Sequence, residues 1–487
     1  MLNKISTGLD LGWTEVLTAT MSHPESVVTW TSSDPAKVSI SPNGSKCTIT
    51  GVATGEATIT ASITVSGSEY SETCHVKVGP VKVYQKVTSV SGLVAGKKYI
   101  LAYEPESGKT ARLMGSIGKH GASLSHGESL RGYTITDNKI TVYDESVNVL
   151  TLSAGSSASN YAFKASIEDE YLSWSSGNSL STSATISGSS SWELTFAANG
   201  DLTITNAATS ERELQYNLVS PRFACYTSKQ QPVALYVEVP YYGFRVYNGS
   251  SMDYENVLVT DGVAPTMTDN QVAVLIKTLD DDELDAMPSA IKTATNVVVN
   301  GEMSDFVVTD KQSVVSTNNG YTNFYAPAAF TTASKVSYAR SGVSGFNSVC
   351  LPFSYTVAQA AEMFGADAEI WELGSVEEGA VNFVKKTSGT VAAGTPVIVK
   401  TSTTTSWNIS NLSGPFAVNG AAPVEDPKSD GTRRATLRGT YQTKTINTGD
   451  ASESGHTYYK LNADGTYFVK APANAKVYPF RVYLDVE

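Results

Sequence analysis

Short segments in which apolar and polar residues alternate recur along most of the chain. Segment 55–65 shows this clearly, because its apolar and hydroxyl-bearing residues fall on opposite faces: Ile59, Ala61 and Ile63 against Thr58, Thr60 and Ser62. A period of two predicts half-buried β-strands. Turn signals such as Asp34-Pro35 and Asn43-Gly44 separate the segments at intervals typical of sandwiches and barrels. Only 279–294 and 356–365 clearly predict short helices.

The pattern predicts a mostly β protein of several domains, as a length of 487 residues also suggests. Four parts are expected along the chain: a β-sandwich at 1–79, a β-barrel or trefoil-like domain at 80–240, a β-rich segment at 241–325 with a strand-helix-strand unit, and a C-terminal β module at 326–487. Gly79-Pro80 marks the first boundary. For the middle domain a sandwich is an open alternative.

The charge of the chain narrows the classes of partner. Charged residues make up only 17% of the sequence, and the net charge is -12. An acidic surface repels phosphate backbones and anionic lipid heads, so we expect no nucleic-acid binding. There is no run of 18 apolar residues, so we also expect no membrane insertion. The first 13 residues lack the basic head and apolar run of a signal peptide.

The first part carries a specific resemblance. Trp30, Ser32, Ser33, Asp34 and Pro35 form a W-x-S-S-D-P stretch, and residues 51–61 read GVATGEATITA. Together they resemble the group-two bacterial immunoglobulin-like domain, over nearly all of residues 1–79. The resemblance implies an exported protein of the cell surface or extracellular space. We therefore expect that a leader has been removed ahead of the first residue.

The cysteines of this part leave two interpretations open. Cys47 shares a strand face with Ile49, and Cys74 shares one with Val76, so both should point inward. They could be buried thiols that pack as small hydrophobes. They could also form a disulfide, which an exported protein would permit.

Aromatic residues of the middle domain are the candidate ligand-binding residues. Short strands there each carry one ring, and the candidates are Tyr171, Trp174, Trp192, Tyr216 and Tyr226. Rings beside Asn and Ser can stack on the faces of sugars. Equally, a small barrel needs aromatic residues in its core. Both interpretations stay open for each ring.

The C-terminal half shows two weaker resemblances. Segment 272–299 reads as strand, turn, helix and strand, and resembles one degenerate leucine-rich repeat. Residues 324–327 (FYAP), 335–340 (KVSYAR) and 350–353 (CLPF) resemble a terminal module of exported proteins in gut-dwelling anaerobes. That module implies an exported location and no known catalytic role.

The sequence contains no motif that indicates a catalytic or metal-binding site. Its five histidines include His120 and His126 in one Gly/Ser-rich segment, which we expect to be a solvated loop. The acidic run that begins at Asp280 lacks the glycine and distal glutamate of a calcium loop, so helix capping is the preferred interpretation. We find no nucleophile motif, phosphate loop or zinc motif.

These observations favour a non-catalytic adhesion or binding protein of the cell surface. The expected partner is a host or microbial surface protein or a glycan, bound by a monomer that needs no cofactor and no metal. The alternative is a carbohydrate-binding protein that captures glycans through its middle domain.

Overall fold

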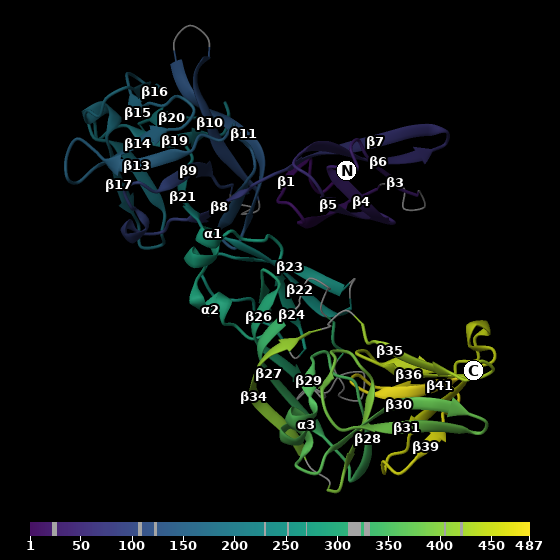
Figure 1. The fold of residues 1–487 in the computed structure, drawn as a ribbon. Coiled ribbons are helices and arrows are strands. Elements are labelled where there is room, and N and C mark those ends of the chain that lie inside the picture. Colours follow the sequence, from purple (N-terminus) through teal and green to yellow (C-terminus); the bar gives the residue numbers. More distant parts are fainter. Residues whose placement is uncertain are drawn as a thin grey trace. The chain divides into compact units, whose positions relative to one another are not determined.

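The computed structural model describes residues 1–487 except 22–26, 106–109, 121–123, 228–229, 251–252, 269, 310–322, 326–331, 404–405 and 419–421. Most of the described chain is β-structure, as predicted, and it divides into two compact units, Met1–Tyr241 and Tyr242–Glu487 (Figure 1). In the described residues, no helix combines the length and the apolar character that a membrane-spanning helix needs.

The first unit begins with a two-sheet sandwich. One sheet contains, in spatial order, β1 (Ser6–Leu9), β7 (Ser68–Val78), β6 (Gly55–Val65) and β3 (Thr29–Ser32). The other contains β2 (Thr14–Thr18), β5 (Lys46–Gly51) and β4 (Val38–Asn43). Ile59 and Ala61 are buried between the sheets, and Ile63 packs at the edge of the same core, which confirms the predicted inward face of β6.

A closed ring of six hydrogen-bonded strands follows the sandwich. Its order is β10 (Thr110–His120), β9 (Lys98–Tyr103), β21 (Ala234–Val239), β8 (Lys82–Lys86), β12 (Lys139–Val142) and β11 (Leu124–Thr136), and β11 pairs with β10 to close it. The predicted middle domain therefore contains a closed barrel, whereas a trefoil stays a prediction.

A second set of strands runs from β9 round to β11 and encloses a second core. Its members are β13 (Leu150–Ala154), β14 (Tyr161–Ala165), β17 (Trp192–Phe196), β18 (Leu202–Asn206), β19 (Glu213–Asn217) and β20 (Arg222–Tyr226), with β15 (Tyr171–Trp174) and β16 (Leu180–Ser183) continuing from β14. Strand β9 serves both cores. Its neighbouring residues Leu101 and Ala102 point to opposite faces and belong to different core clusters, so β9 is apolar on both faces.

The sandwich and the barrel meet within this unit through a close contact. The hydroxyl of Tyr143, just after β12, lies 3.0 Å from Ser6 Oγ on β1. A Cβ atom at Gly8 would come within 2.2 Å of the Tyr143 side chain, so only glycine allows β1 to lie this near. Tyr241, at the end of the unit, donates a hydrogen bond to Asp10.

The second unit is built around three sheets. The largest contains β23 (Asp253–Val259), β22 (Tyr242–Ser250), β24 (Val272–Leu275), β25 (Val297–Val299), β26 (Glu302–Thr309), β27 (Thr332–Ser341) and β34 (Ser406–Ala417). The next contains β28 (Gly345–Val349), β33 (Val397–Thr401), β30 (Glu369–Glu377) and β31 (Ala380–Lys386). The third contains β35 (Glu425–Ser429), β36 (Arg434–Gly439), β41 (Val482–Val486), β38 (Thr457–Leu461) and β39 (Phe468–Lys470).

Two small strand pairs complete the unit. They are β29 (Tyr355–Thr356) with β32 (Thr390–Val391), and β37 (Lys444–Ile446) with β40 (Ala475–Val477). The predicted boundary between residues 325 and 326 lies inside the largest sheet, because β26 pairs in parallel with β27. One core cluster joins Phe306, Ile370 and Leu437 from the three sheets, so residues 242–487 form one unit and do not separate at 325.

The acidic run at residue 280 caps a helix, as predicted. Asp280 accepts a hydrogen bond from the backbone N–H of Glu283 at 2.8 Å, and the Glu283 carboxylate accepts from the N–H of Asp280 at 3.3 Å. This capping box begins α1 (Asp281–Ala286), which α2 (Ser289–Lys292) follows. Strands β24 and β25 on either side pair in parallel. The strand-helix-strand unit is therefore present, and its kinship with leucine-rich repeats stays a prediction.

Three aromatic residues of the C-terminal motifs, Phe324, Tyr338 and Phe353, are core residues. Phe324 packs against Phe306 and Phe480, and Tyr338 packs against Phe353 and Phe480. Ala326 and Pro327 lie outside the described residues. The predicted amphipathic helix is α3 (Val357–Phe364), which buries Phe364 against Trp407 on β34 at 4.7 Å between ring centroids. Aromatic packing therefore accounts for the conspicuous residues of these motifs.

Candidate functional site

Three of the five rings predicted to bind a ligand are buried, and two of them, Trp192 and Tyr216, belong to the second core. Trp192 and Tyr216 are each 0% exposed, and Tyr226 is nearly buried. The Trp192 indole donates to the carbonyl of Leu172 at 3.1 Å, and Tyr216 stacks on Tyr103 at 4.3 Å between centroids. A sugar cannot stack on a ring that is covered on both sides, so these residues serve packing.

The other two predicted rings are half-buried on β15. Residues Tyr171 and Trp174 are three positions apart, so they leave the strand on opposite faces. Trp174 packs against the second core, and its indole donates to the carbonyl of Gly177 at 3.0 Å. The pair does not form one aromatic platform.

A groove lies in the sandwich, between the hairpin β6–β7 and the first residues of the chain. The groove has a volume of about 560 Å³. Its apolar lining comes from two sides: Met1, Leu2, Met21 and Val28 on one, and Ile63, Val65 and Tyr70 on the other. This volume lies within the range of ligand-binding pockets. The groove is therefore the candidate binding site of the Ig-like region.

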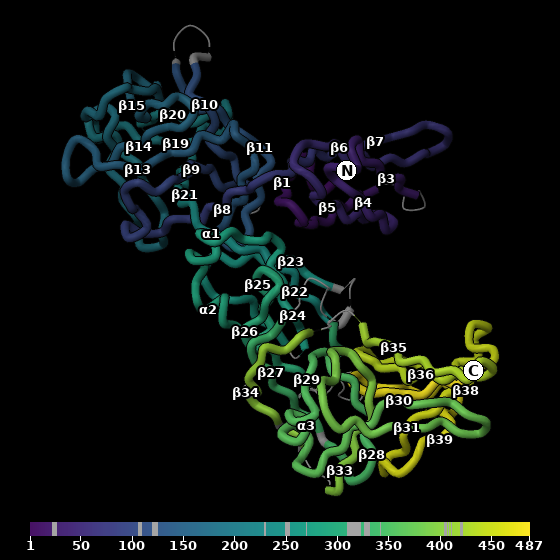
Figure 2. The backbone as a smooth tube through the Cα atoms, in the orientation of Figure 1, coloured from purple at the N-terminus to yellow at the C-terminus, as the bar shows by residue number. Residues whose placement is uncertain are grey.

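The hairpin that forms one wall extends past its neighbours (Figure 2). Strand β3 pairs with β6 only over residues 59–62, and β1 pairs with β7 only over 75–78. Among the described residues, Ser68–Thr73 therefore pair with β6 alone and present an outer backbone edge. Tyr70 is 61% exposed on this edge. Unpaired edges of this kind accept an added strand.

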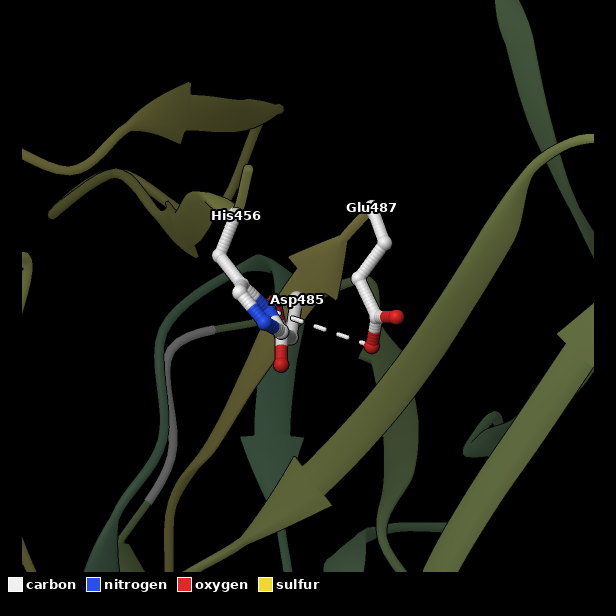
Figure 3. Close-up of side chains that lie close together, drawn as sticks. All are labelled: His456, Asp485 and Glu487. Carbon is white, nitrogen blue, oxygen red and sulfur yellow. Dashed lines mark hydrogen bonds and ion pairs between the residues drawn. The ribbon is translucent and has the colours of Figure 1, made fainter. Parts of the chain in front are cut away.

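A second candidate is a polar cluster at the end of the chain. His456 Nδ1 lies 2.8 Å from Asp485 Oδ1 and 3.8 Å from Glu487 Oε1 (Figure 3). The ligand atoms of the three residues lie within 4.8 Å of one another, a spacing that could surround a metal ion. Asp485 is 2% exposed. Burial, followed by the negative charge of Asp485, raises the pKa of Tyr458 to about 12.

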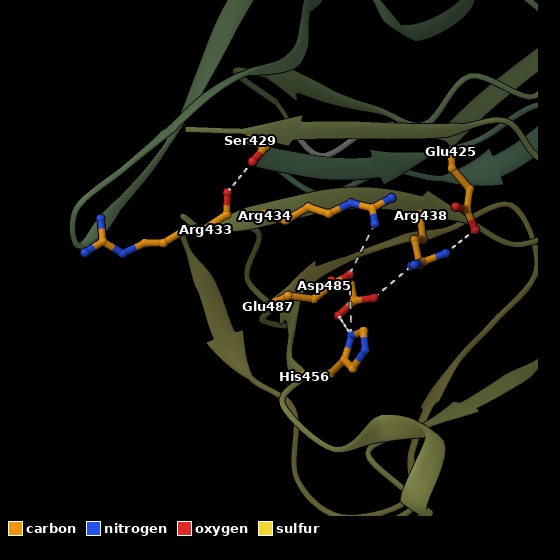
Figure 4. A network of polar contacts seen from close by, with 8 residues as sticks. All are labelled: Glu425, Ser429, Arg433, Arg434, Arg438, His456, Asp485 and Glu487. Atoms are coloured by element: carbon orange, nitrogen blue, oxygen red, sulfur yellow. Dashed lines mark hydrogen bonds and ion pairs between the residues drawn. The ribbon is translucent and has the colours of Figure 1, made fainter. Parts of the chain in front are cut away.

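Two arginines, Arg438 and Arg434, form ion pairs with the carboxylates of this cluster. Arg438 Nε donates to Asp485 Oδ2 at 2.9 Å, and the same guanidinium pairs with Glu425 (Figure 4). Arg434 lies 4.0 Å from Glu487. Both oxygens of Asp485 are thus engaged, and Asp485 and Glu487 each have an arginine partner. We interpret the cluster as an ion-pair network that joins β36 to β41 and to the loop before β38.

The two histidines expected in a solvated loop lie instead on a hairpin. His120 ends β10 and His126 belongs to β11, with residues 121–123 between the strands outside the described part. In the strand register His126 lies opposite Gly118, and His120 lies opposite Leu124. The alternating pattern through 110–136 could have indicated these strands.

All four cysteines are buried and free, which agrees with the thiol interpretation of Cys47 and Cys74. Burial raises the pKa of the thiol at every one of them, to about 12 for Cys74 and Cys225. The thiolate is the nucleophile in cysteine chemistry, so none of these side chains suits covalent catalysis.

We expect that iodoacetamide at pH 8 leaves the four cysteines of the folded protein unmodified, and alkylates them all in concentrated urea. Mass spectrometry of the intact chain measures both states. Because folding raises the pKa of these thiols, their contribution to stability is fully present below the thiol pKa of the unfolded chain, about 8.5. The contribution of Cys74 and Cys225 should diminish as the pH rises from there toward 12. Rapid alkylation of the folded protein would contradict the assignment.

The sequence did not indicate the groove or the polar cluster. Tyr70 lies in a polar stretch that no motif singles out, and His456 lies 29 positions from its partner Asp485. The one available signal was the length of segment 55–65, whose alternation continues beyond the reach of a short neighbouring strand.

Comparison with known proteins identifies the first part of the chain. Residues 9–73 match the family model of the bacterial Ig-like domain (group 2). No curated protein matches the chain. A solved GH43 β-1,3-galactosidase aligns over 37% of this chain and 39% of its own length, at 14% identity and a TM-score of 0.23, so the chain spans about two fifths of that enzyme.

Two further structures align at similarly low scores. The lysenin pore aligns over 49% of this chain and 87% of its own, with 11% identity and a TM-score of 0.22. A chimeric titin Z1Z2 with a decorin peptide aligns over 34% and 88%, with 14% identity and a TM-score of 0.14. Such scores support no argument about fold or function. The family match confirms the Ig-like domain that the tryptophan and glycine motifs predict within residues 1–79.

Proposed function

We propose that the chain is a non-catalytic binding protein of the bacterial surface, and that its Ig-like domain holds an extended segment of a partner protein. The groove of about 560 Å³ beside the exposed edge of β7 carries this proposal. The family match in the same domain supports a surface-associated role. An extracellular location, a monomeric state and a C-terminal module of the gut-anaerobe kind belong to the same proposal.

The groove and the edge suit a polypeptide in the extended conformation. Added strands bind through main-chain hydrogen bonds, and pockets for alternate side chains give specificity. Here the outer edge of Ser68–Thr73 offers the backbone groups. Ile63, Val65 and Tyr70 offer apolar contacts beside that edge. A partner strand with apolar residues at alternate positions would match both features.

Selection from a random 12-residue peptide library displayed on phage tests the proposal on the full chain. We expect enriched peptides with alternating apolar residues. Tyr70→Ser and Ile63→Thr should weaken binding of the enriched peptides about 10-fold, which is about 1.4 kcal/mol. The matched control is Tyr467→Ser, because Tyr467 is 62% exposed in the other unit.

Each variant needs an unchanged thermal transition before its binding is compared. If the enriched peptides bind the Tyr70→Ser and Ile63→Thr variants with the same affinity as the unaltered chain, the binding site lies elsewhere. Failure to enrich any peptide would overturn the proposal for the groove.

A further inference from the structure

A small pocket opens on the barrel, away from the predicted rings. It has a volume of about 140 Å³. Four segments meet there: the end of β8 at Lys86 and Val87, Glu104 just after β9, the turn before β18 at Gly200 and Asp201, and residues 232–234 at the start of β21. The volume is well below that of the groove and fits a ligand of one small ring.

Two charged side chains of the pocket are held in place by their contacts. Lys86 Nζ lies 2.6 Å from Glu104 Oε2, and each side chain is less than a quarter exposed. The hydroxyl of Tyr236 donates to the other oxygen of Glu104. A carboxylate fixed at both oxygens keeps its orientation, and so does the ammonium that it binds.

The third charged residue is positioned by a tight turn. Asn199 donates from its amide to Asp201 Oδ2 at 2.7 Å, and the backbone N–H of Asp201 donates to Asn199 Oδ1 at 3.1 Å. Gly200 between them has a φ of 86°, which favours glycine. The Asn-Gly turn thereby fixes the orientation of Asp201, which lines the pocket.

We propose that this pocket binds a single neutral sugar ring, a hexopyranose at the end of a glycan. One wall is apolar, with Val87, Leu202 and Val233, and can receive the C–H face of a sugar. The other wall places donors beside acceptors. Lys86 has three N–H donors, of which Glu104 takes one, and each carboxylate oxygen has two lone pairs. Sugar hydroxyls both donate and accept, so they match this mixed wall.

The charge of the pocket argues against anionic ligands. Glu104 and Asp201 carry two negative charges and Lys86 carries one positive charge. The surplus of one negative charge repels an anionic sugar. This inference rests on the proposed binding function and adds a second ligand class at a separate place in the chain.

Saturation-transfer NMR of the full chain tests the inference with methyl glycosides of glucose, galactose, mannose and N-acetylglucosamine. We expect transfer to at least one glycoside, and about 10-fold weaker binding for Asp201→Asn. Lys86→Met should weaken binding similarly. The matched control is Asp169→Asn, since Asp169 lies in the turn between β14 and β15 of the same unit and pairs with Lys164 outside the pocket.

Glucuronate and glucosamine serve as charged probes in the same experiment. No transfer to any neutral glycoside, transfer only to a charged probe, or unchanged binding by Asp201→Asn and Lys86→Met would each overturn the inference. Peptide selection on these variants separates the two proposals. If peptides still bind at the groove while no sugar binds, only the sugar pocket is lost.

Discussion

Replacement of Trp192 by alanine should lower the free energy of unfolding of the first unit by about 3–5 kcal/mol. The side chain is 0% exposed and belongs to the second core, which strands β13 to β20 enclose. Its removal leaves a cavity that neighbouring strands cannot close, and it also leaves the carbonyl of Leu172 without the indole donor. Urea unfolding followed by circular dichroism measures the loss. Hydrogen exchange with mass spectrometry then assigns it to residues 82–239.

Trp174→Ala is the matched control, because Trp174 has the same side chain in the same core but is only half-buried. We expect less than half of the effect. Equal effects of the two substitutions would contradict the burial that the structure assigns to Trp192. A glycan-binding loss in Trp192→Ala would report unfolding, and for this reason Asp201 is the residue to use for the sugar pocket.

The sequence predicts well those elements whose partners lie nearby in the chain. The alternation at residues 55–65 predicted both the strand β6 and its buried face, because its partner β7 follows directly after a two-residue turn. Asp280 was predicted to cap a helix, since capping depends only on the next three residues. The Ig-like domain was predicted from short motifs whose spacing is fixed by hairpins of this kind.

Features that depend on distant pairing were not predictable in the same way. Leu101 and Ala102 are both buried, because β9 lies between two cores, and alternation cannot show this. The parallel pairing of β26 with β27 connects segments on both sides of residue 325, where the sequence predicted a boundary. Closure of the six-strand ring likewise depends on β21, which pairs with β8 and β9 more than 100 positions earlier in the chain.

The candidate sites show the same limit. An aromatic ring in a β-rich sequence can be core or ligand platform, and only the strand faces decide between them. Trp192 and Tyr216 proved to be core. The pocket joins Asp201 to Lys86 and Glu104, which lie 115 and 97 positions earlier, so no local motif could indicate it.

Arg438→Met should destabilise the second unit by about 3 kcal/mol, because it leaves the carboxylate of Asp485 buried without its guanidinium partner. Loss of one member of a buried ion pair costs about 3–5 kcal/mol, and the lower end applies because Arg438 itself is 21% exposed. The measurement is urea unfolding of the full chain, with hydrogen exchange at residues 434–439 and 482–486 to place the effect. Arg434→Met on the same strand is the matched control.

The control should change stability by less than about 1 kcal/mol, since Arg434 is 48% exposed and its partner Glu487 is also accessible. The double variant Arg438→Met with Asp485→Leu then separates charge from packing. Without the buried carboxylate, much of the stability should return, because an apolar pair of similar volume can replace a buried ion pair. If Arg438→Met were as mild as Arg434→Met, or if the double variant lost the sum of both single effects, the network would not hold β36 to β41 through charge.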